Sequence, residues 1–450
     1  MERTLSQELA HFVTELTFDR LPAEVIDKAK ACLLHGIAVG LAGSSLEFAQ
    51  IARQLIASEE QITGNTGASI LGSDIRTTIM GAAFANSALF HSRVQEDTHG
   101  TAHTGTVILP AALALAEREH RSGREFLEAI VAGYEVMAAV SRDFTALSTP
   151  KGFRASSIYG VFGAAAATAK LLHLSEEQCA DALGFASAFA FGTTQSFASG
   201  TMEWHFENGL AARNGMLATL LAQQGAKASP VALEGNAGFY HAFTDTQEHL
   251  ERIVNQLGYT WEILNVTFKL YPVCAFNQTP LIAALSLVQE QDIELDDIEH
   301  ITVEMNDYEA TYPGMAHMGP YTTTGQTLMS TPFCISSVLA YKQFSYAALT
   351  HFDDPHTLNL VKKTTMIGRP ERQPLSIRID VHLKDRRTYI KEMNVNEQYY
   401  SWGFERECDV VNALREDIPL SDNAIQTMVT LIDHLEKSAD MNELVHILVR

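Results

Sequence analysis

The chain has 450 residues, of which 46% are hydrophobic and only 19% are charged, so it can bury a large core and has the length of two or more domains. Its formal net charge of -22 argues against a nucleic-acid or anionic-membrane partner, because either needs a basic face. An anionic substrate would therefore be held by a few local cations working against an unfavourable overall field.

The cysteines and the first residues bear on the cellular compartment. The five cysteines are scattered without a C-x-x-C pair, which is typical of reduced thiols in a cytosolic protein and argues against an iron–sulfur cluster. The start, M-E-R-T-L-S-Q-E-L, lacks a basic segment followed by an apolar one, and the longest apolar runs are interrupted by Lys170 or Asp181. We expect no signal peptide, no membrane span and a cytoplasmic location.

From Leu5 to about Tyr259, small and apolar residues recur at helical spacing. The frequent Ala and Gly imply helices that approach one another closely. Ser175, followed three residues later by Gln178, predicts a capping box at a helix start. The expected helices span residues 23–41, 47–57, 78–90, 110–120, 124–143, 159–172, 176–191 and 209–224.

The pattern changes after Trp261. Residues 298–305 and 375–383 alternate between apolar and polar, and D-R-R-T followed by a second run at 389–395 predicts a hairpin. Helices are expected at 280–290 and 332–341, and an amphipathic helix at 421–448 that packs back on the first domain. The sequence thus predicts a mainly α protein. A large all-helical domain would comprise residues 1–262 and 406–450, and a smaller α+β domain residues 263–405.

Residues 91–103, H-S-R-V-Q-E-D-T-H-G-T-A-H, gather proton-transfer groups between two apolar segments, the second of which is expected to open a helix at Pro110. Three histidines, two carboxylates and an arginine predict a catalytic loop for acid–base chemistry. A polar turn between helices is one alternative. A metal site at His99 and His103 is another, which we disfavour because Gly100 and Thr101 are poor helix formers and the two histidines need not share a face.

Two further segments carry polar groups next to predicted helices. In K-G-F-R-A-S-S-I-Y-G, Arg154 and two serines precede an apolar helix, which suits either a carboxylate site or a loop whose serines cap the helix. In S-G-T-M-E-W-H-F-E-N-G, Glu203, His205 and Glu207 alternate with aromatic residues. An extended conformation would place these three on one side, facing a cleft or water, and we favour water.

Lys269 lies in F-K-L-Y-P-V-C-A-F-N-Q among apolar neighbours, at the junction of the two predicted domains. Desolvation there would lower its pKa and make it a usable base, and ligand sites favour such junctions. A surface lysine with only its stem buried is the alternative. The glycine-rich stretches lack the strand–turn–helix context of a nucleotide site and are expected to be turns.

These segments resemble the MmgE/PrpD family, which includes 2-methylcitrate dehydratase, cis-aconitate decarboxylase and iminodisuccinate epimerase. The resemblance runs through E-D-T-H-G-T-A-H, V-I-L-P-A-A-L-A-L-A-E, G-V-F-G-A-A-A-A-T-A-K-L-L and F-K-L-Y-P-V-C, and covers nearly the whole chain. It implies a large all-helical domain, a smaller α+β domain and an active site between them. It also implies a homodimer and catalysis without a metal or an organic cofactor.

Part of the family's residue pattern is retained. Asp97, Thr98 and His103 match its D-T…H pattern, and Lys269 matches the lysine before Y-P-x-C.

Other positions depart from the pattern. Val94 stands for the first aspartate of D-F-D-D-T, Arg154 for the histidine of G-F-H, and Trp204 for the lysine after G-T-M-x. Ala275 and Gln278 replace an arginine and a histidine near Y-P-V-C. These departures predict a substrate other than 2-methylcitrate.

The resemblance and the residues together predict a cofactor-independent lyase. It would abstract a proton next to a carboxylate of a small di- or tricarboxylate, with loss of water. Lys269 or His103 would be the base, Asp97 would orient a histidine, and His99 would be the acid. Tyr159 and Tyr308 are weaker candidates for a second proton donor, and arginines would pair with substrate carboxylates.

Three alternatives stay open: epimerisation, in which the same carbanion is reprotonated on its other face, decarboxylation, and a carboxylate-binding protein that has lost catalysis. No metal ligand is predicted. The predicted catalytic residues are Asp97, His99, His103, Lys269 and Tyr308, and the predicted substrate-binding residues are Arg93, Thr98, Arg154, Ser156, Tyr159 and Arg213.

Overall fold

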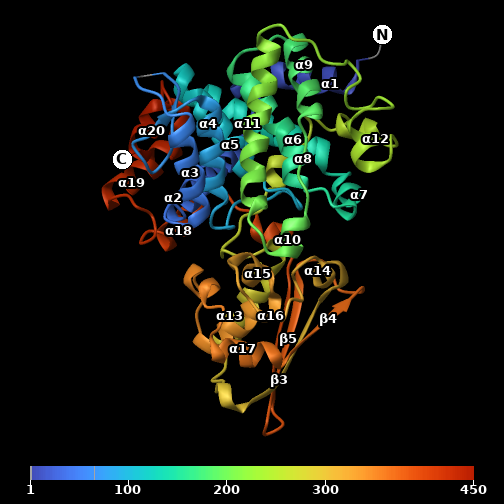
Figure 1. Cartoon of the computed structure of the whole chain (residues 1–450), viewed down its shortest axis with the longest axis vertical. Helices are drawn as coiled ribbons and strands as arrows, with labels where there is room; N and C mark the ends of the chain where they lie inside the picture. The colour runs from blue at the N-terminus through green and yellow to red at the C-terminus, as the bar shows by residue number, and fades with distance from the viewer. Residues whose placement is uncertain (1–2, 65, 450) are drawn as a thin grey trace. The chain divides into compact units, whose positions relative to one another are not determined.

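The computed structural model describes residues 3–64 and 66–449, and the chain divides into two compact units. Unit 1 comprises Met1–Thr194, Glu203–Phe268 and Ser401–Arg450, and unit 2 comprises Gln195–Met202 and Lys269–Tyr400. The predicted fold class, mainly α with a smaller α+β part, is confirmed (Figure 1). The predicted domain boundaries at residues 262 and 406 stay predictions, because internal contacts alone do not show that a segment folds independently.

Unit 1 is built of helices, with α4, α5, α6, α8 and α11 packed against one another. Two short antiparallel strands of two residues each, β1 (Ala68–Ser69) and β2 (Arg76–Thr77), accompany them. The helices are α1 (Leu5–Glu15), α2 (Ala23–Ala42), α3 (Glu47–Glu59), α4 (Ile79–His91), α5 (Gly105–Glu119), α6 (Gly123–Ser141), α7 (Thr145–Ser148), α8 (Ala155–Leu171), α9 (Glu176–Ala188), α11 (Glu203–Gln223), α12 (Phe239–Thr244), α18 (Phe404–Ala413), α19 (Asp422–Asp433) and α20 (Asn442–Leu448).

The central helices approach so closely that glycine is required at their contacts. A Cβ at Gly215 of α11 would lie 2.5 Å from the Cβ of Ala164 in α8, and a Cβ at Gly163 would lie 2.9 Å from the Cβ of Met137 in α6. The predicted close packing is confirmed. So is the capping box at Ser175, whose hydroxyl accepts a hydrogen bond from the backbone of the third residue of α9.

Three predictions for unit 1 are wrong in detail. The helix α5 begins at Gly105 rather than at Pro110, which lies inside it, because an internal proline removes one helical hydrogen bond without always ending the helix. The stretch 203–207 is the start of α11 rather than extended chain, since five alternating residues are too few to exclude a helix. The C-terminal amphipathic segment is two helices, α19 and α20, rather than one.

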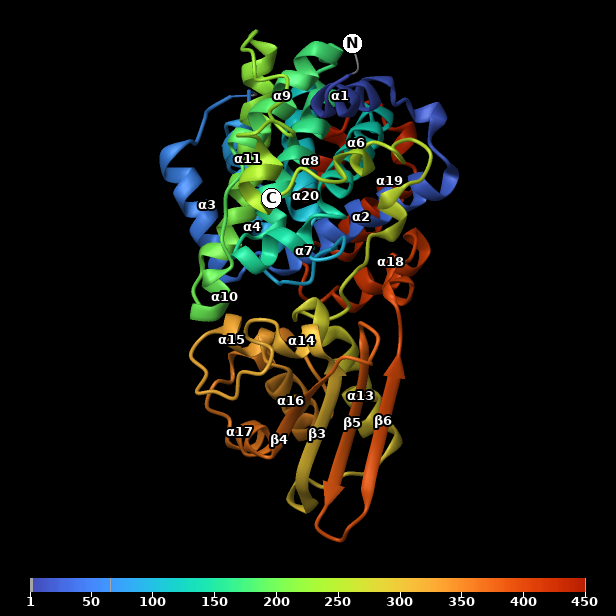
Figure 2. The same cartoon turned by 90° about the vertical axis from the view of Figure 1, so that its right-hand side faces the viewer.

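Unit 2 contains a four-stranded sheet in the order β4-β3-β5-β6, seen in Figure 2, with β3 and β4 parallel and the other pairs antiparallel. The predicted strand β3 and the predicted β5–β6 hairpin are confirmed. The strand β4, T-T-M-I-G-R, was not predicted, because it lacks the alternation that marks a one-sided strand. The elements are α10 (Gln195–Ser199), α13 (Gln278–Glu290), α14 (Asp307–Thr311), α15 (Thr324–Met329), α16 (Thr331–Tyr341), α17 (Pro355–Lys362), β3 (Ile298–Asn306), β4 (Thr364–Arg369), β5 (Ser376–Leu383) and β6 (Thr388–Asn394).

Within the described part of the chain, no single helix has the length and apolar character to cross a membrane. Only α2 and α3 taken together would, and the chain bends by 90° between them. All five cysteines are free thiols.

Candidate active site

The loop of residues 92–104 connects the end of α4 to the start of α5, and its residues 92–99 are buried. Val94 has a φ of 56°. This left-handed conformation is strained for a β-branched residue, and tertiary contacts must hold it.

One side of the loop is fixed by a buried ion pair. The carbonyl of Gln95 lies 2.7 Å from Nε2 of His35, and Nδ1 of His35 lies 2.8 Å from the carboxylate of Glu407, which also accepts a hydrogen bond from the Trp402 indole. Both partners of His35 are acceptors, so both ring nitrogens donate. Burial, the largest single effect, lowers the pKa of His35, but Glu407, the Gln95 carbonyl and Asp97 together raise it, and the net direction is upward.

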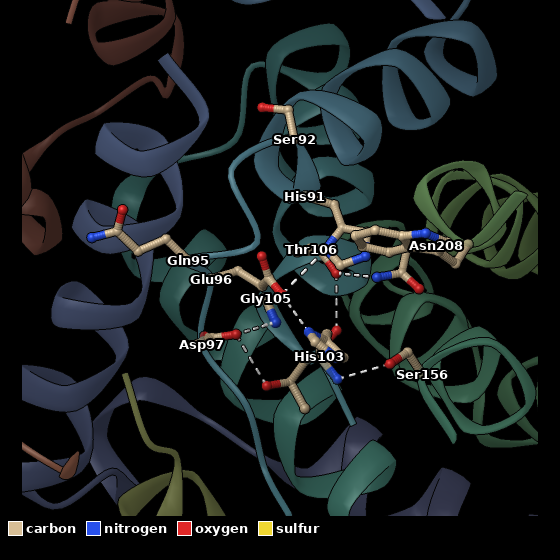
Figure 3. A network of polar contacts seen from close by, with 12 residues as sticks. His91, Ser92, Gln95, Glu96, Asp97, His103, Gly105, Thr106, Ser156 and Asn208 are labelled. Carbon is tan, nitrogen blue, oxygen red and sulfur yellow. Dashed lines mark hydrogen bonds and ion pairs between the residues drawn. The ribbon is translucent and has the colours of Figure 1, made fainter. Parts of the chain in front are cut away.

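Asp97 ties the end of the loop to α5. Its carboxylate accepts hydrogen bonds from the Gly105 backbone at 2.6 Å, from the Thr104 hydroxyl at 3.2 Å and from the Tyr134 hydroxyl. Asp97 is 2% exposed, and burial raises its pKa. Figure 3 shows its side chain directed at Gly105 rather than at His91 or His103.

Glu96, the neighbour of Asp97, is the carboxylate that contacts histidines. Its Oε1 is hydrogen-bonded to Nδ1 of His103 and lies 3.2 Å from Nδ1 of His91 (Figure 3). The centroids of the His91 and His103 imidazole rings are 5.1 Å apart. His91 is fully buried, whereas the His103 side chain is 19% exposed. The backbone N–H of His103 donates to Ser156 at 2.9 Å, at the start of α8.

Arg154 immediately precedes α8 and joins this group to α11. Its Nη2 lies 2.9 Å from Nε2 of His91. Its Nη1 donates to the Trp204 carbonyl and lies 3.3 Å from the Glu207 carboxylate. The ends of four helices, α4, α5, α8 and α11, therefore meet around His91, Glu96 and His103.

The start of α11 supplies a buried, uncharged histidine. The ring of His205 stacks on Phe48 and Trp204, at centroid distances of 3.4 and 3.6 Å. Burial, followed by the nearby His91 and Arg154, holds the pKa of His205 well below its usual value.

The expectation that Glu203, His205 and Glu207 all face water is wrong. His205 and Glu207 are buried, and only Glu203 is exposed. The reason is that the stretch is helical, and alternate residues of a helix do not share one face as they would in an extended chain.

His99 contacts a carboxylate other than Glu96. Its Nε2 lies 3.0 Å from Glu262, in the short helix η4 (Glu262–Asn265), and Glu262 also accepts from Arg142. The hydrogen bond from His99 is the largest of the contacts that lower the pKa of Glu262 to about 2. Next to His99, Thr98 pairs with Thr267 through two backbone hydrogen bonds of 2.8 Å.

The remaining predicted residues contact other partners or belong to unit 2. Arg93 pairs with Asp417 at 2.7 Å, and Arg213 pairs with Glu60. Tyr159 is buried and donates to Ser148. In unit 2, Lys269 is buried, and Tyr308 in α14 is 52% exposed.

Of the residues predicted from the sequence, the structure therefore brings together His103, Arg154 and Ser156. It adds His91, Glu96, Trp204, His205 and Glu207, which were not among the predicted site residues although each lies in a segment that the sequence marks. Helical spacing in residues 203–213 was the available signal for the last three.

His91, Glu96 and His103 are also the described residues that could hold a metal, since one ligand atom from each lies within 4.8 Å of the others. The donor set fits a metal poorly, because the Arg154 guanidinium, a fixed cation, contacts one of the histidines.

The chain is similar in sequence to proteins of one family. Residues 7–251, more than half of the chain, match the MmgE/PrpD N-terminal domain. The chain is 31% identical to a cis-aconitate decarboxylase-like protein, oryM, of Aspergillus oryzae, over 82% of this chain and 81% of that protein. It is 28% identical to a cis-aconitate decarboxylase of Aspergillus terreus, over 80% and 78% of the two chains. It is 25% identical to that of Homo sapiens, over 100% and 95%. The matched region contains the whole group of residues around His103, and the chain belongs to the MmgE/PrpD family.

Proposed function

We propose that this protein is a lyase that acts on a small di- or tricarboxylate and uses His103 for proton transfer. The observation that carries the proposal is the contact of His103 Nδ1 with the buried carboxylate of Glu96. A carboxylate in this position orients the imidazole and stabilises its protonated form when Nε2 takes up a proton.

Among the reactions open to such a site, we favour decarboxylation over the loss of water expected from the sequence. The relatives named above as cis-aconitate decarboxylases, or as similar to them, support this choice. In such a reaction the bond to one carboxyl group breaks and carbon dioxide leaves. The electron pair moves through the adjacent double bond, and a carbon atom receives a proton. His103 would supply that proton, and Lys269 would hold a substrate carboxylate.

The changed positions leave the identity of the tricarboxylate to experiment. Arg154, Trp204 and Gln278 stand where the family pattern has other side chains, and each changes the size or charge offered to a substrate. We therefore propose cis-aconitate as the first compound to test, within a panel of unsaturated and hydroxylated polycarboxylates.

The test is incubation of the purified protein with this panel in deuterated water, with carbon dioxide and the proton NMR spectrum followed together. Decarboxylation releases carbon dioxide and places one deuterium in the product. A new alkene without carbon dioxide indicates dehydration. Deuterium uptake with inversion and without an alkene indicates an epimerase. Tight binding of a polycarboxylate without turnover would favour a binding protein.

The site assignment is tested by the variants His103→Ala and Lys269→Ala, which we expect to lose activity by at least about a hundredfold. His11→Gln is the matched control, since His11 forms a histidine–glutamate pair of 2.9 Å at the surface. Full activity in both alanine variants would exclude this site.

A further inference from the structure

We infer that Arg154 is a positioning residue that fixes the proton on Nδ1 of His91 and, through Glu96, the proton on Nδ1 of His103. The tautomers follow from the contacts alone, whereas their effect on turnover rests on the proposed function.

The first step concerns Arg154 and His91. A guanidinium has only N–H donors, so Nε2 of His91, 2.9 Å from Arg154 Nη2, must be the acceptor. A ring that accepts at Nε2 is neutral and carries its proton on Nδ1. The proton-bearing Nδ1 lies 3.2 Å from Oε1 of Glu96.

The second step concerns Glu96 and His103. The carboxylate of Glu96 faces a proton-bearing nitrogen of His91, which favours its charged form. A charged carboxylate accepts only, so Nδ1 of His103, in hydrogen-bond contact with it, is a donor. In the neutral ring of His103, the lone pair is then on Nε2, and this nitrogen takes up and releases the proton.

The side chain of Arg154 is held in place by further contacts with α11. Its guanidinium also contacts the Trp204 carbonyl and the Glu207 carboxylate, and the side chain is 3% exposed. Glu207 is itself fixed by the backbone of Thr193. An arginine can only donate, so it sets a single direction for this hydrogen bond.

The arrangement also explains why this group suits proton transfer better than metal binding. A metal at His91, Glu96 and His103 would need the Nδ1 lone pair of His91. Arg154 keeps a proton on that nitrogen.

The decisive experiment is ¹⁵N NMR of histidine-labelled protein without substrate. His91→Gln and His103→Gln variants assign the two signals. We expect the wild-type protein to show a protonated Nδ1 and an unprotonated Nε2 at His91, with Nδ1 protonated at His103. A proton on Nε2 of His91 in the wild-type protein overturns the inference.

Variants of Arg154 test its role in turnover. We expect Arg154→Met to change the tautomer signals of His91 and to lower kcat about ten- to a hundredfold with KM within about threefold. Arg154→Lys, which keeps a cationic donor, should restore the signals and most of kcat. Arg76→Met, which breaks the Arg76–Glu117 pair elsewhere in unit 1, should leave the histidine signals unchanged.

The two proposals can fail separately. Wild-type tautomers as expected, in a protein that turns over no polycarboxylate, would refute the proposed function and leave the role of Arg154 in place. Unchanged His91 signals and kcat in a folded Arg154→Met variant would refute the role of Arg154, whatever the substrate.

Discussion

Glu96 and Asp97 are adjacent carboxylates with different surroundings, so the same substitution should have different consequences at each. Glu96 contacts the imidazoles of His91 and His103. Asp97 accepts hydrogen bonds from the start of α5 and from Tyr134. We therefore expect Glu96 to act in proton transfer and Asp97 to hold the loop in its conformation.

Replacing Glu96 by glutamine should lower kcat about a hundred- to a thousandfold while the melting temperature changes little. The amide has nearly the same shape, but it cannot stabilise a protonated His103. The measurements are steady-state kinetics and thermal unfolding. Glu119→Gln is the control, since Glu119 pairs with Arg118 in a partly exposed position. Activity within about twofold of wild type would remove Glu96 from the mechanism.

At the scale of single residues, the sequence predicted the loop and His103, but it did not distinguish Glu96 from Asp97. Residue type cannot do so, because both are acids. The difference arises from the left-handed backbone at Val94 and from Tyr134, which lies 37 residues further along the chain. Neither the strained conformation nor the distant partner leaves a local pattern.

At the scale of elements, the junction between the loop and α5 should tolerate no side chain. A Cβ at Gly105 would lie 2.6 and 2.7 Å from the carboxylate oxygens of Asp97 and 2.8 Å from the Tyr134 hydroxyl. Gly105→Ala should therefore destabilise the protein by about 1 to 3 kcal/mol and lower kcat, because the loop must move. Urea unfolding and steady-state kinetics measure both.

Gly100→Ala, in the same loop, is the comparison. Gly100 has a φ of 55°, and a Cβ added there would have no atom within 4 Å, so only the backbone conformation opposes the change. We expect a cost of about 1 kcal/mol. A larger cost at Gly100 than at Gly105 would show that the contact with Asp97 does not hold the loop.

The attachment of η4 to α6 should depend on pH. Glu135 of α6 is buried and accepts hydrogen bonds from the backbones of Glu262 and Ile263, and burial raises its pKa to about 8 from the usual 4.5. Between these two values the folded protein holds a proton that the unfolded chain has released. Stability therefore falls as the pH rises from about 4.5 to about 8.

The variant Glu135→Gln should lack this contribution. Urea unfolding at several pH values in this range should show the variant gaining stability relative to wild type as the pH rises. Glu119→Gln should follow the wild-type curve. Parallel curves for wild type and Glu135→Gln would mean that Glu135 titrates normally in the folded protein.

Helices and strands with a regular spacing of apolar residues were predictable from the sequence. Elements that depend on contacts with distant segments were not. The helices α2 and α6 and the β5–β6 hairpin were found from their patterns. The start of α11 and the strand β4 were missed. The first has a short polar and aromatic alternation, and the second is a strand through its parallel pairing with β3.

At the scale of the whole molecule, two compact units divide the predicted residues. The group around His103 is in unit 1, whereas Lys269 and Tyr308 are in unit 2. A shared active site and a homodimer remain predictions from the family resemblance. The oligomer is checked by light scattering on the purified protein, whose chain mass is 49.4 kDa.

The net charge of -22 should make the reaction with an anionic substrate faster in salt. An acidic protein repels a di- or tricarboxylate at long range, and salt shortens that repulsion from about 30 Å at 0.01 M to about 8 Å at 0.15 M. We expect kcat/KM to rise about two- to threefold over this range while kcat stays constant, because screening acts on encounter rather than on the bound complex. Sodium chloride and potassium acetate should give the same result if the effect is screening rather than ion binding. A fall in kcat/KM with salt would instead mean that local cations such as Arg154 and Lys269 dominate the field met by the substrate.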